Sequence, residues 1–475
     1  MPVVQSTPER IQMAVTILLG LALGAWLVVC LNNYLLTDWN EVRLAPTFMW
    51  WHGANPYPGP GESPLTTWIY GPVTLLLFLP AVAASDTLGA LIIGACVNLC
   101  LAAIPLLVLF RAVARPDSIP VQIRAFMLTV AAWPACNLVF SSSDNTAMAL
   151  GLLSLALLSH NETSRPSQHT LWLLAAAGVL ALWSKPTELG PVLGQLLWLA
   201  LRHGKISALR QTLRLAVAGG ICGILFIVVF GAEGFLYNVF VVPSRIPTVD
   251  LWEKITSPVY IYHIALYVLL PLVLMIPRWR TWLFTAHPAQ ASCWFFLLSL
   301  PFNIAGFATI GGNINSLHGC VYLLPWLALT AARGNRWLPA VLMTVVLALQ
   351  IRPGIGKLSE LGTARQSLAP AEKLASIVPG QIYFPWNPLI TFYAEQRFYH
   401  AEDGLLTRSL TGERISRETL FSGLPATFNF IAYRGHVRPS YFDGRLPVTH
   451  THYHFNGWTL VSSDGLLPQA LSPIP

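Results

Sequence analysis

The sequence predicts an all-α polytopic membrane protein with a small C-terminal α+β domain outside the membrane. Of the 475 residues, 54% are hydrophobic and only 10% are charged, with a mean hydropathy of +0.57. Soluble domains, by contrast, carry about 25% charged residues. Apolar stretches close to the ~20 residues that a helix needs to cross a bilayer recur up to Gln350. The membrane body is therefore expected over residues 1–351 and the more polar domain over 352–475.

The membrane body contains about twelve apolar segments, so we expect 11–13 transmembrane helices. The first segment follows Arg10 and lacks a small-residue cleavage site, which favours a retained span over a removed signal peptide. The segments are 11–31, 68–85, 87–110, 124–140, 145–159, 171–184, 187–201, 215–231, 258–277, 291–310, 319–332 and 337–351.

Short basic clusters between the apolar segments predict the cytoplasmic ends of the helices. Counting back from the last cluster places the tail and the later polar turns on the outer side of the membrane. Counting forward from Arg10 also places the opening loop, 32–70, on the outer side. The clusters are Arg111/Arg115/Arg124, Arg202/Lys205/Arg210/Arg214, Arg278/Arg280 and Arg333/Arg336.

The two counts differ by one crossing between Trp68 and Arg111. Either the Pro-flanked stretch 71–84 only dips into the membrane, or the run 87–110 is broken near Pro105. The sequence alone leaves both alternatives open.

Segments 171–184 and 187–201 are too short to cross a bilayer untilted, and the turn "WSKPTELGP" joins them. Broken backbone at membrane depth is tolerated only where it lines a cavity or is buried in protein. The membrane body is therefore expected to hold a wet pocket that opens outward. No internal repeat and no symmetric pair of interrupted helices is present, which favours an enzyme over a transporter.

The tail begins with helix formers over 357–380 and continues with "QIYFPWNPLITFYAEQRFYHAEDGL", whose short alternating runs indicate a small α+β unit. Its aromatic density predicts a domain that rests on the membrane surface or over a pocket mouth.

The composition also excludes several classes of function. The net charge of +7 comes from basic clusters at helix ends, so no nucleic-acid partner is expected. The seven Cys lie in or beside apolar runs and give no disulfide framework. His450, His452 and His454 share one face of a strand, but no carboxylate pattern accompanies them, so no metal site and no cofactor are predicted. Walker, Rossmann, HExxH and GxSxG motifs are absent.

Asp38 lies just beyond the first span, in a Pro- and Gly-stiffened outer loop, with Glu41 nearby. A partly buried carboxylate at such a position can accept a proton from a hydroxyl, because burial raises its basicity. The alternative is a helix cap with solvated neighbours.

Lys185 lies in the turn between the two short segments, where an ionisable group is a functional candidate by default and a cation suits a phosphate. The alternative is a structural pair with Glu188. In "FSSSDNTAMALG", Asp144 and Asn145 lie at an outer helix start, either in a pocket or as part of an N-cap.

In "IGGNINSLHGC", a helix start would present free N–H groups to an anion. His318 could add a proton or a positive charge there, the alternative being a satisfied histidine at the membrane interface. Arg245, in the loop 233–254, could capture a phosphate, the alternative being a solvated loop. The polar residues of this predicted outer pocket are Asn313, Asn315 and His318.

Three stretches resemble a known superfamily: "NPYPGPGESPLTTWIYGP", "SSSDNTAMALGLLSLALL" and "ALWSKPTELGPVLGQLLWLALRHGK". With the Asp shortly after the first span, their order is similar to that of the GT-C membrane glycosyltransferases. The nearest branch is the polyprenol-phosphate-mannose-dependent mannosyltransferases of glycosyltransferase family 87, and the resemblance covers roughly residues 1–350.

The resemblance implies an inverting transfer of a sugar, mannose by default, from a polyprenyl-phosphate donor in a bacterial inner membrane. The acceptor hydroxyl of a lipid, glycan or protein would be reached from the outer face. Asp38 matches the catalytic carboxylate of the first loop, Lys185 the basic residue of the KP-type turn, and His318 a polar pocket residue. The first loop lacks a paired DD or DE, so no metal ligand follows from the resemblance. The long tail is more similar to that of the aminoarabinose and oligosaccharide transferases of the superfamily.

Two other functions remain open. A lipid or solute transporter, or flippase, of envelope glycan synthesis would also need a polar pocket within the membrane. A non-catalytic partner in polysaccharide assembly would tolerate Asp38→Asn without effect.

Overall fold

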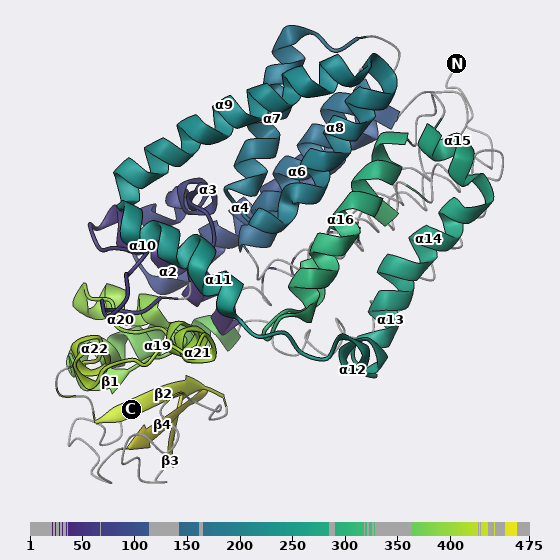
Figure 1. Cartoon of the computed structure of the whole chain (residues 1–475). Helices are drawn as coiled ribbons and strands as arrows, with labels where there is room; N and C mark the ends of the chain where they lie inside the picture. The colour runs from purple at the N-terminus through teal and green to yellow at the C-terminus, as the bar shows by residue number, and fades with distance from the viewer. Residues whose placement is uncertain are drawn as a thin grey trace, which may run out of the picture.

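The chain folds as a helical membrane bundle joined to a C-terminal domain with a small sheet (Figure 1). The computed structural model describes residues 37–66, 68–113, 142–160, 165–284, 290–317, 363–425, 427, 429–435, 441 and 452–462, with a few single positions elsewhere. The fold class predicted from the sequence is confirmed.

The first half of the bundle comprises α2 (Asp38–Trp51), α3 (Pro72–Leu77), η1 (Leu79–Ala83), α4 (Thr87–Val113), α6 (Ser142–His160), α7 (Gln168–Leu182), η2 (Pro186–Glu188) and α8 (Leu189–His203). The second half comprises α9 (Lys205–Phe230), α10 (Ala232–Leu236), η3 (Tyr237–Val241), α11 (Val242–Arg245), α12 (Leu251–Thr256), α13 (Ile261–Ile264), η4 (Ala265–Leu269), α14 (Leu270–Met275), η5 (Ile276–Arg278), α15 (Trp279–Phe284), α16 (Gln290–Ala308) and η6 (Ile314–Leu317). The C-terminal domain comprises α19 (Thr363–Ile377), β1 (Ile382–Tyr383), α20 (Pro388–Glu395), α21 (Glu402–Leu410), α22 (Arg417–Ser422), β2 (Phe430–Arg434), β3 (His452–Phe455) and β4 (Trp458–Ser462).

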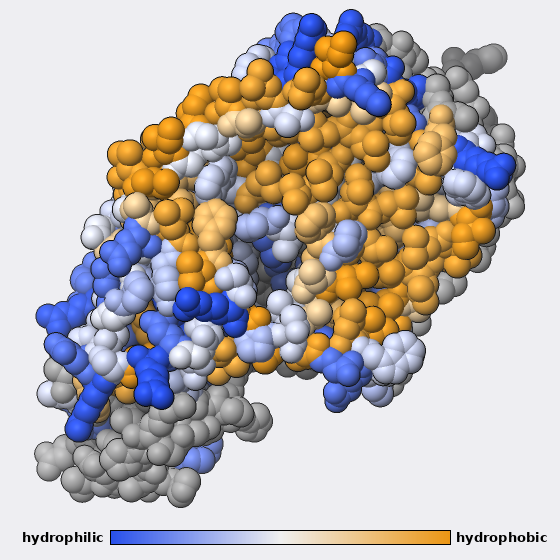
Figure 2. Space-filling view, in the orientation of Figure 1, coloured by the Kyte–Doolittle hydropathy of each residue, from blue (hydrophilic) through white to orange (hydrophobic). Residues whose placement is uncertain are grey.

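Within the described ranges, three helical runs are long and apolar enough to cross a bilayer: Lys205–Phe230, Ile261–Phe284 and Gln290–Ala308. On the first of these, Ile224 is 68% exposed and Val228 is 76% exposed. Such exposure of large aliphatic side chains fits contact with lipid rather than with water. Figure 2 shows an apolar band over these helices, between hydrophilic ends.

The stretch 71–84 forms only α3 and η1, of six and five residues. At about 1.5 Å per residue, α3 is roughly 9 Å long and cannot cross a bilayer of about 30 Å. α4, in contrast, runs without a break through Pro105. The first of the two sequence alternatives is therefore the one observed.

α7 and α8 contain 15 residues each, or about 22 Å, shorter than the ~30 Å hydrocarbon core. The predicted interruption of the two segments is thus observed. α8 packs closely on α16 because Gly190 and Gly194 form a small-xxx-small pair. A Cβ on Gly190 would lie 2.4 Å from the Cα of Ser299, so the two helix backbones touch at this point.

The sheet of the C-terminal domain has the strand order β1-β2-β4-β3, in which β1 and β2 are parallel and the other pairs antiparallel. Its core is continuous with the segment 37–84, because Phe48 of α2 is buried in the same cluster as Phe430 and Leu460. This segment is called the first outer segment below, after the side of the membrane that the sequence predicts for it. Most residues of α2 are buried, polar ones included, and this packing explains why a segment with an internal Pro46 forms a helix where the sequence predicts a stiffened loop.

Candidate functional site

A buried group of charged and polar side chains lies where the broken helices meet. The ammonium of Lys185 forms an ion pair with Oδ1 of Asp144, and Nδ2 of Asn315 donates a hydrogen bond of 2.6 Å to Oδ2 of the same carboxylate. The Asp144 side chain is 0% exposed and that of Lys185 11%. These three residues, called the Lys185 cluster below, are all predicted site residues. They come from the start of α6, the α7–α8 turn and η6.

The backbone of the α7–α8 turn sets the position of Lys185. α7 ends before Trp183, and Lys185 is extended, with φ −151° and ψ 120°. An extended conformation is favoured because the next residue is Pro186, whose ring clashes with a helical predecessor. The chain therefore leaves the helix at Lys185 and restarts as η2, which packs against α6 and α16.

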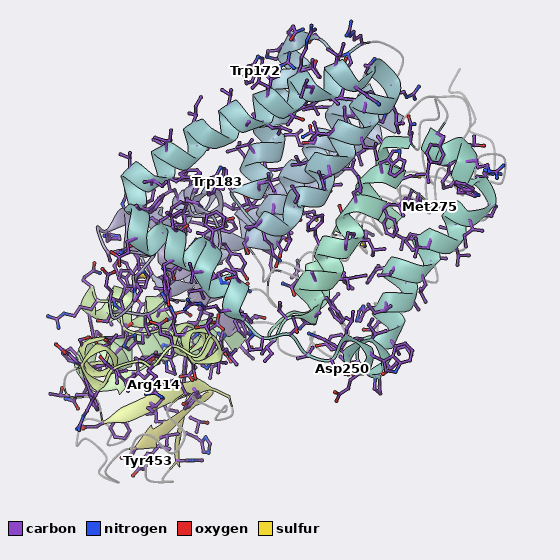
Figure 3. All side chains as sticks on the ribbon, viewed as in Figure 1. Trp172, Trp183, Asp250, Met275, Arg414 and Tyr453 are labelled. Carbon is purple, nitrogen blue, oxygen red and sulfur yellow. The ribbon has the colours of Figure 1, made fainter. Side chains whose placement is uncertain are left out.

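The first outer segment docks on this turn. Gly71 N–H donates to the carbonyl of Ser184 at 3.2 Å, and Val73 N–H donates to that of Trp183 at 3.4 Å. A Cβ on Gly71 would lie 1.6 Å from the Trp183 carbonyl oxygen, so only glycine permits this approach. Figure 3 labels Trp183 at the end of α7 nearer the C-terminal domain and Trp172 at the other end.

Lys254 holds the backbone that leads to the Lys185 cluster. Its ammonium donates to the carbonyls of Phe307 and Gly312, both at 2.6 Å, and to that of Thr309 at 3.3 Å. These carbonyls lie at and just beyond the end of α16, where a cation satisfies orphan acceptors. Lys254 thereby fixes the segment that leads to Asn315. The sequence gives no signal for this role.

Arg43 connects the Lys185 cluster to the C-terminal domain. Its Nη2 lies 3.5 Å from Oδ2 of Asp403, and its guanidinium stacks over the ring of Tyr70, 4.9 Å from the centroid. The charge of Asp144 also acts on Arg43. Burial raises the pKa of Asp403 to about 6, although Arg43 opposes this shift. Sequence reasoning did not select Arg43, because its partners come from distant parts of the chain.

Asp38 and Glu41 lie on a different face of α2. Arg434 Nη2 lies 2.6 Å from Asp38 Oδ1, and Asn387 Nδ2 donates to that oxygen at 3.4 Å and to Glu41 Oε2 at 2.9 Å. Asp38 is only 3% exposed. The structure thus brings these two predicted residues together, in the contact between α2 and the C-terminal domain.

Glu41 also caps the start of α20. Its Oε1 accepts hydrogen bonds from the N–H groups of Leu389, at 2.9 Å, and Ile390, at 3.2 Å, as side-chain oxygens do at helix N-termini. Burial raises the pKa of Glu41 to about 7, although the hydrogen bond from Asn387 and the charge of Arg434 both lower it. Glu41 therefore changes its charge near neutral pH.

The remaining predicted residues lie around these groups. Asn145 donates to Asn98 Oδ1 at 3.0 Å and joins α6 to α4. Asn313 is exposed, and its Oδ1 accepts from the N–H of Ile314 at 2.7 Å. Arg245 is exposed at the end of α11, which packs on α21. His318 lies outside the described residues.

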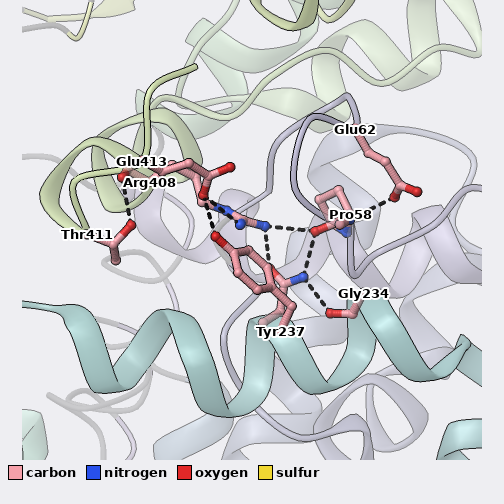
Figure 4. A network of polar contacts seen from close by, with 9 residues as sticks. Pro58, Glu62, Gly234, Tyr237, Arg408, Thr411 and Glu413 are labelled. Carbon is pink, nitrogen blue, oxygen red and sulfur yellow. Dashed lines mark hydrogen bonds and ion pairs between the residues drawn. The ribbon is translucent and has the colours of Figure 1, made fainter. Parts of the chain in front are cut away.

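A second polar network joins the first outer segment, η3 and the C-terminal domain (Figure 4). Arg408, which is 1% exposed, donates to the Pro58 carbonyl and to Asn238 Oδ1, both at 2.8 Å, and to Glu413 Oε2 at 2.9 Å. Its guanidinium also lies 4.7 Å from the ring centroid of Tyr237. The network holds these three segments together beside the hollow described next.

The surface is hollowed between the α10–α11 segment and the α8–α16 pair, with hydrophilic atoms visible on its floor (Figure 2). α8, which begins just after the turn that carries Lys185, and α11, which ends at Arg245, both border this hollow. Across the described part of the chain, no group of three His, Cys, Asp or Glu side chains is arranged as metal ligands would be. The α7–α8 turn thus brings a buried cation to the start of a helix that borders the hollow, as a binding site for an anionic ligand would need.

No family model matches the chain, and no curated protein matches it in sequence. Its fold matches that of ArnT from Cupriavidus metallidurans bound to undecaprenyl phosphate. The TM-score is 0.59 at 13% sequence identity, and the match covers 95% of this chain and 99% of ArnT. This likeness shows a shared fold, and the fold is the GT-C-like one that the sequence predicts.

The apo state of the same ArnT matches with a TM-score of 0.53 at 12% identity, over 91% of this chain and 95% of ArnT. Both matches extend through the C-terminal domain as well as the membrane body. The long tail is therefore part of the shared fold.

Proposed function

We propose that the protein is a glycosyltransferase that moves a sugar from a polyprenyl-phosphate donor to an acceptor hydroxyl at the outer face of the membrane. The observation that carries the proposal is the Lys185 cluster, a buried cation at a break between short membrane helices. It lies in a fold shared over nearly the full length with ArnT, whose structure holds undecaprenyl phosphate.

The donor phosphate is assigned to Lys185 and Arg245. Lys185 is held by Asp144, whose other oxygen is held by Asn315, and needs little reorganisation to stabilise the charge that develops on the leaving phosphate. Arg245 is exposed at the end of α11 and suits the capture of an incoming phosphate, because a guanidinium forms bidentate hydrogen bonds. His318 is proposed to line the same pocket.

The acceptor hydroxyl needs a proton acceptor, and Asp38 is proposed as this general base in an inverting transfer. Its carboxylate is held in one orientation by Arg434 and Asn387, and α2 carries Arg43 toward Asp144. Asp144 is the competing carboxylate, since it already contacts Lys185. If Asp38 is the base, Asp38→Asn abolishes transfer; if Asp144 is the base, Asp144→Asn does.

The basic clusters support an active site on the outer face. Because α3 and η1 are too short to cross, the forward and backward charge counts now agree. Both counts place α2, the α7–α8 turn, η6 and the tail on one side, opposite the basic α8–α9 turn. A bacterial inner membrane and a metal-free reaction complete the proposal.

Mannose is the proposed sugar, from the sequence resemblance to the family 87 enzymes. A hexosyl or pentosyl donor would use the same leaving phosphate and the same base. The acceptor class, whether lipid, glycan or protein, is left to the experiment.

The test measures transfer of radiolabelled sugar from synthetic polyprenyl-phosphate-mannose by the purified protein in lipid nanodiscs, with and without EDTA. Wild type is compared with Asp38→Asn and Asp144→Asn. Glu253→Gln, which changes an exposed carboxylate, is the matched control. Donor hydrolysis is counted along with transfer, so that a missing acceptor does not hide the activity.

Loss of turnover in Asp38→Asn alone supports Asp38 as the base, whereas loss in Asp144→Asn alone transfers that role to Asp144. Turnover that EDTA leaves unchanged supports the metal-free reaction. No turnover with any lipid-phosphate sugar of a donor panel would refute the enzyme and favour a transporter.

A further inference from the structure

A groove separate from the Lys185 cluster opens where the end of α2 meets α20 and α22. Its volume is about 640 Å³, within the ~300–1,000 Å³ that small-molecule sites occupy. Its lining includes His52, Phe392, Arg397, Phe398, Phe421 and Ser422. No step of the proposed reaction uses these residues.

One wall of the groove consists of aromatic rings. Phe392 and Phe398 are stacked with their centroids 4.8 Å apart, and the His52 ring lies 4.7 Å from Phe392. Phe392 is buried, Phe398 is half-buried, and Phe421, which also lines the groove, is 46% exposed. Ring faces carry partial negative charge and attract the electropositive C–H faces of apolar or amphipathic rings. The wall therefore fits a flat, amphipathic ligand such as a sugar ring.

The rim of the groove is cationic. Arg397 is exposed, and Arg417 places its guanidinium 5.5 Å from the Phe421 ring centroid. The nearby carboxylate of Glu395 already accepts hydrogen bonds from Tyr399, at 2.7 Å, and from Gly380 N–H, at 3.0 Å. Arg397 and His52 line the groove, Arg417 lies beside the lining residue Phe421, and the nearby carboxylate of Glu395 is already engaged. This balance of charge favours an acidic ligand.

The groove lies at a distance from the reaction centre that suits the far end of an acceptor. His52, the residue just after the end of α2, follows Asp38, the proposed base, by 14 residues (52 − 38), or about 21 Å at 1.5 Å per residue. This separation along α2 exceeds one sugar ring, so a sugar in the groove is not the one whose hydroxyl Asp38 would deprotonate.

From these observations we infer that the groove is a subsite for an acidic sugar of a saccharide acceptor, distal to the hydroxyl that receives the new sugar. The inference rests on the proposed transfer and names its acceptor class. Ring faces hold the sugar ring, and Arg397 pairs with its carboxylate or phosphate.

The test is a binding measurement that needs no turnover. Saturation-transfer difference NMR is recorded on the full protein in nanodiscs with trigalacturonate, an acidic trisaccharide, and with maltotriose, a neutral one. The variants are Arg397→Ala and Phe421→Ala, both at exposed positions, with Arg280→Ala at the other end of the bundle as matched control.

Trigalacturonate is expected to bind more tightly than maltotriose, and each groove variant to weaken it about tenfold, the effect of losing one charged hydrogen bond or one aromatic contact. Arg280→Ala is expected to bind as wild type does. Equal binding of the two saccharides, no binding, or binding that both groove variants leave intact would each overturn the inference. If the protein binds trigalacturonate but turns over no donor, the groove is a saccharide site and the proposed sugar transfer is refuted.

Discussion

Gly71→Ala tests whether the docking of the first outer segment sets the position of Lys185. The new Cβ would lie 1.6 Å from the Trp183 carbonyl oxygen and 2.3 Å from its carbon. Real Cβ contacts do not fall below 3.0 Å, so either the backbone at Gly71 or the backbone at Trp183 must move by at least 3.0 − 1.6 = 1.4 Å. Both partners are backbone, and no side-chain rotation can relieve the overlap. Where the α7–α8 turn is the segment that moves, Lys185, two residues after Trp183, moves with it.

A displacement of about 1 Å in a catalytic group costs on the order of 10²-fold in rate. We therefore expect the turnover of polyprenyl-phosphate-mannose by Gly71→Ala to fall by about that factor, measured as radiolabelled product in nanodiscs. Gly220→Ala is the control, because a Cβ at Gly220 meets nothing within 4 Å. Hydrogen exchange of the Trp183–Glu188 peptide gives a readout without turnover, and faster exchange is expected in Gly71→Ala alone. Wild-type rates of both turnover and exchange in Gly71→Ala would refute the reasoning.

Three further predictions concern buried polar groups. Arg408→Met leaves the partners of a buried ion pair unsatisfied and should cost about 3–5 kcal/mol, seen as a lower thermal midpoint in nanodiscs that the exposed Arg414→Met does not show. Burial lowers the pKa of His400 to about 4, so its contribution to stability is complete above pH 6.5 and is lost as the pH falls to 4, by about 3 kcal/mol. The difference between wild type and His400→Gln across this range should show that slope, and a flat difference would contradict it. Lys185→Ala should lower donor turnover by about 10²–10³-fold, while Lys185→Arg should retain part of the turnover. If Lys185→Ala turns over the donor as fast as wild type does, the ammonium of Lys185 does not bind the phosphate.

The sequence predicts each member of the Lys185 cluster as a separate site residue, because the signals for these residues are local. Pro186 after Lys185 forces an extended residue, and two short apolar segments flank the turn, so a buried cation follows from the chain itself. The sequence also indicates an outer helix start at Asp144 and a polar turn at Asn315. Lys185, Asp144 and Asn315 meet in one cluster because α6, α8 and α16 pack together. No local pattern in the sequence shows this packing.

The environment of α2 could not be predicted because it depends on contacts between distant parts of the chain. Asn387, which bonds Asp38, follows it by 349 residues. No local pattern distinguishes an Asp that starts a helix under a tail domain from one in a solvated loop. The helix itself forms because Phe48 and its neighbours bury against the C-terminal core, where tertiary packing overrides an internal proline.

α2 has two faces that make different contacts, and this couples the C-terminal domain to the Lys185 cluster. Asp38 and Glu41, three residues apart, hold Arg434, Asn387 and the start of α20. Arg43 lies on another face, over Tyr70 and within reach of the charge of Asp144. Because a helix transmits displacement as a rigid body, any shift of the domain against Asp38 and Glu41 also shifts Arg43 against the cluster. Because burial raises the pKa of Glu41 to about 7, we expect the contact between α2 and the C-terminal domain, and with it the position of Arg43, to change near neutral pH.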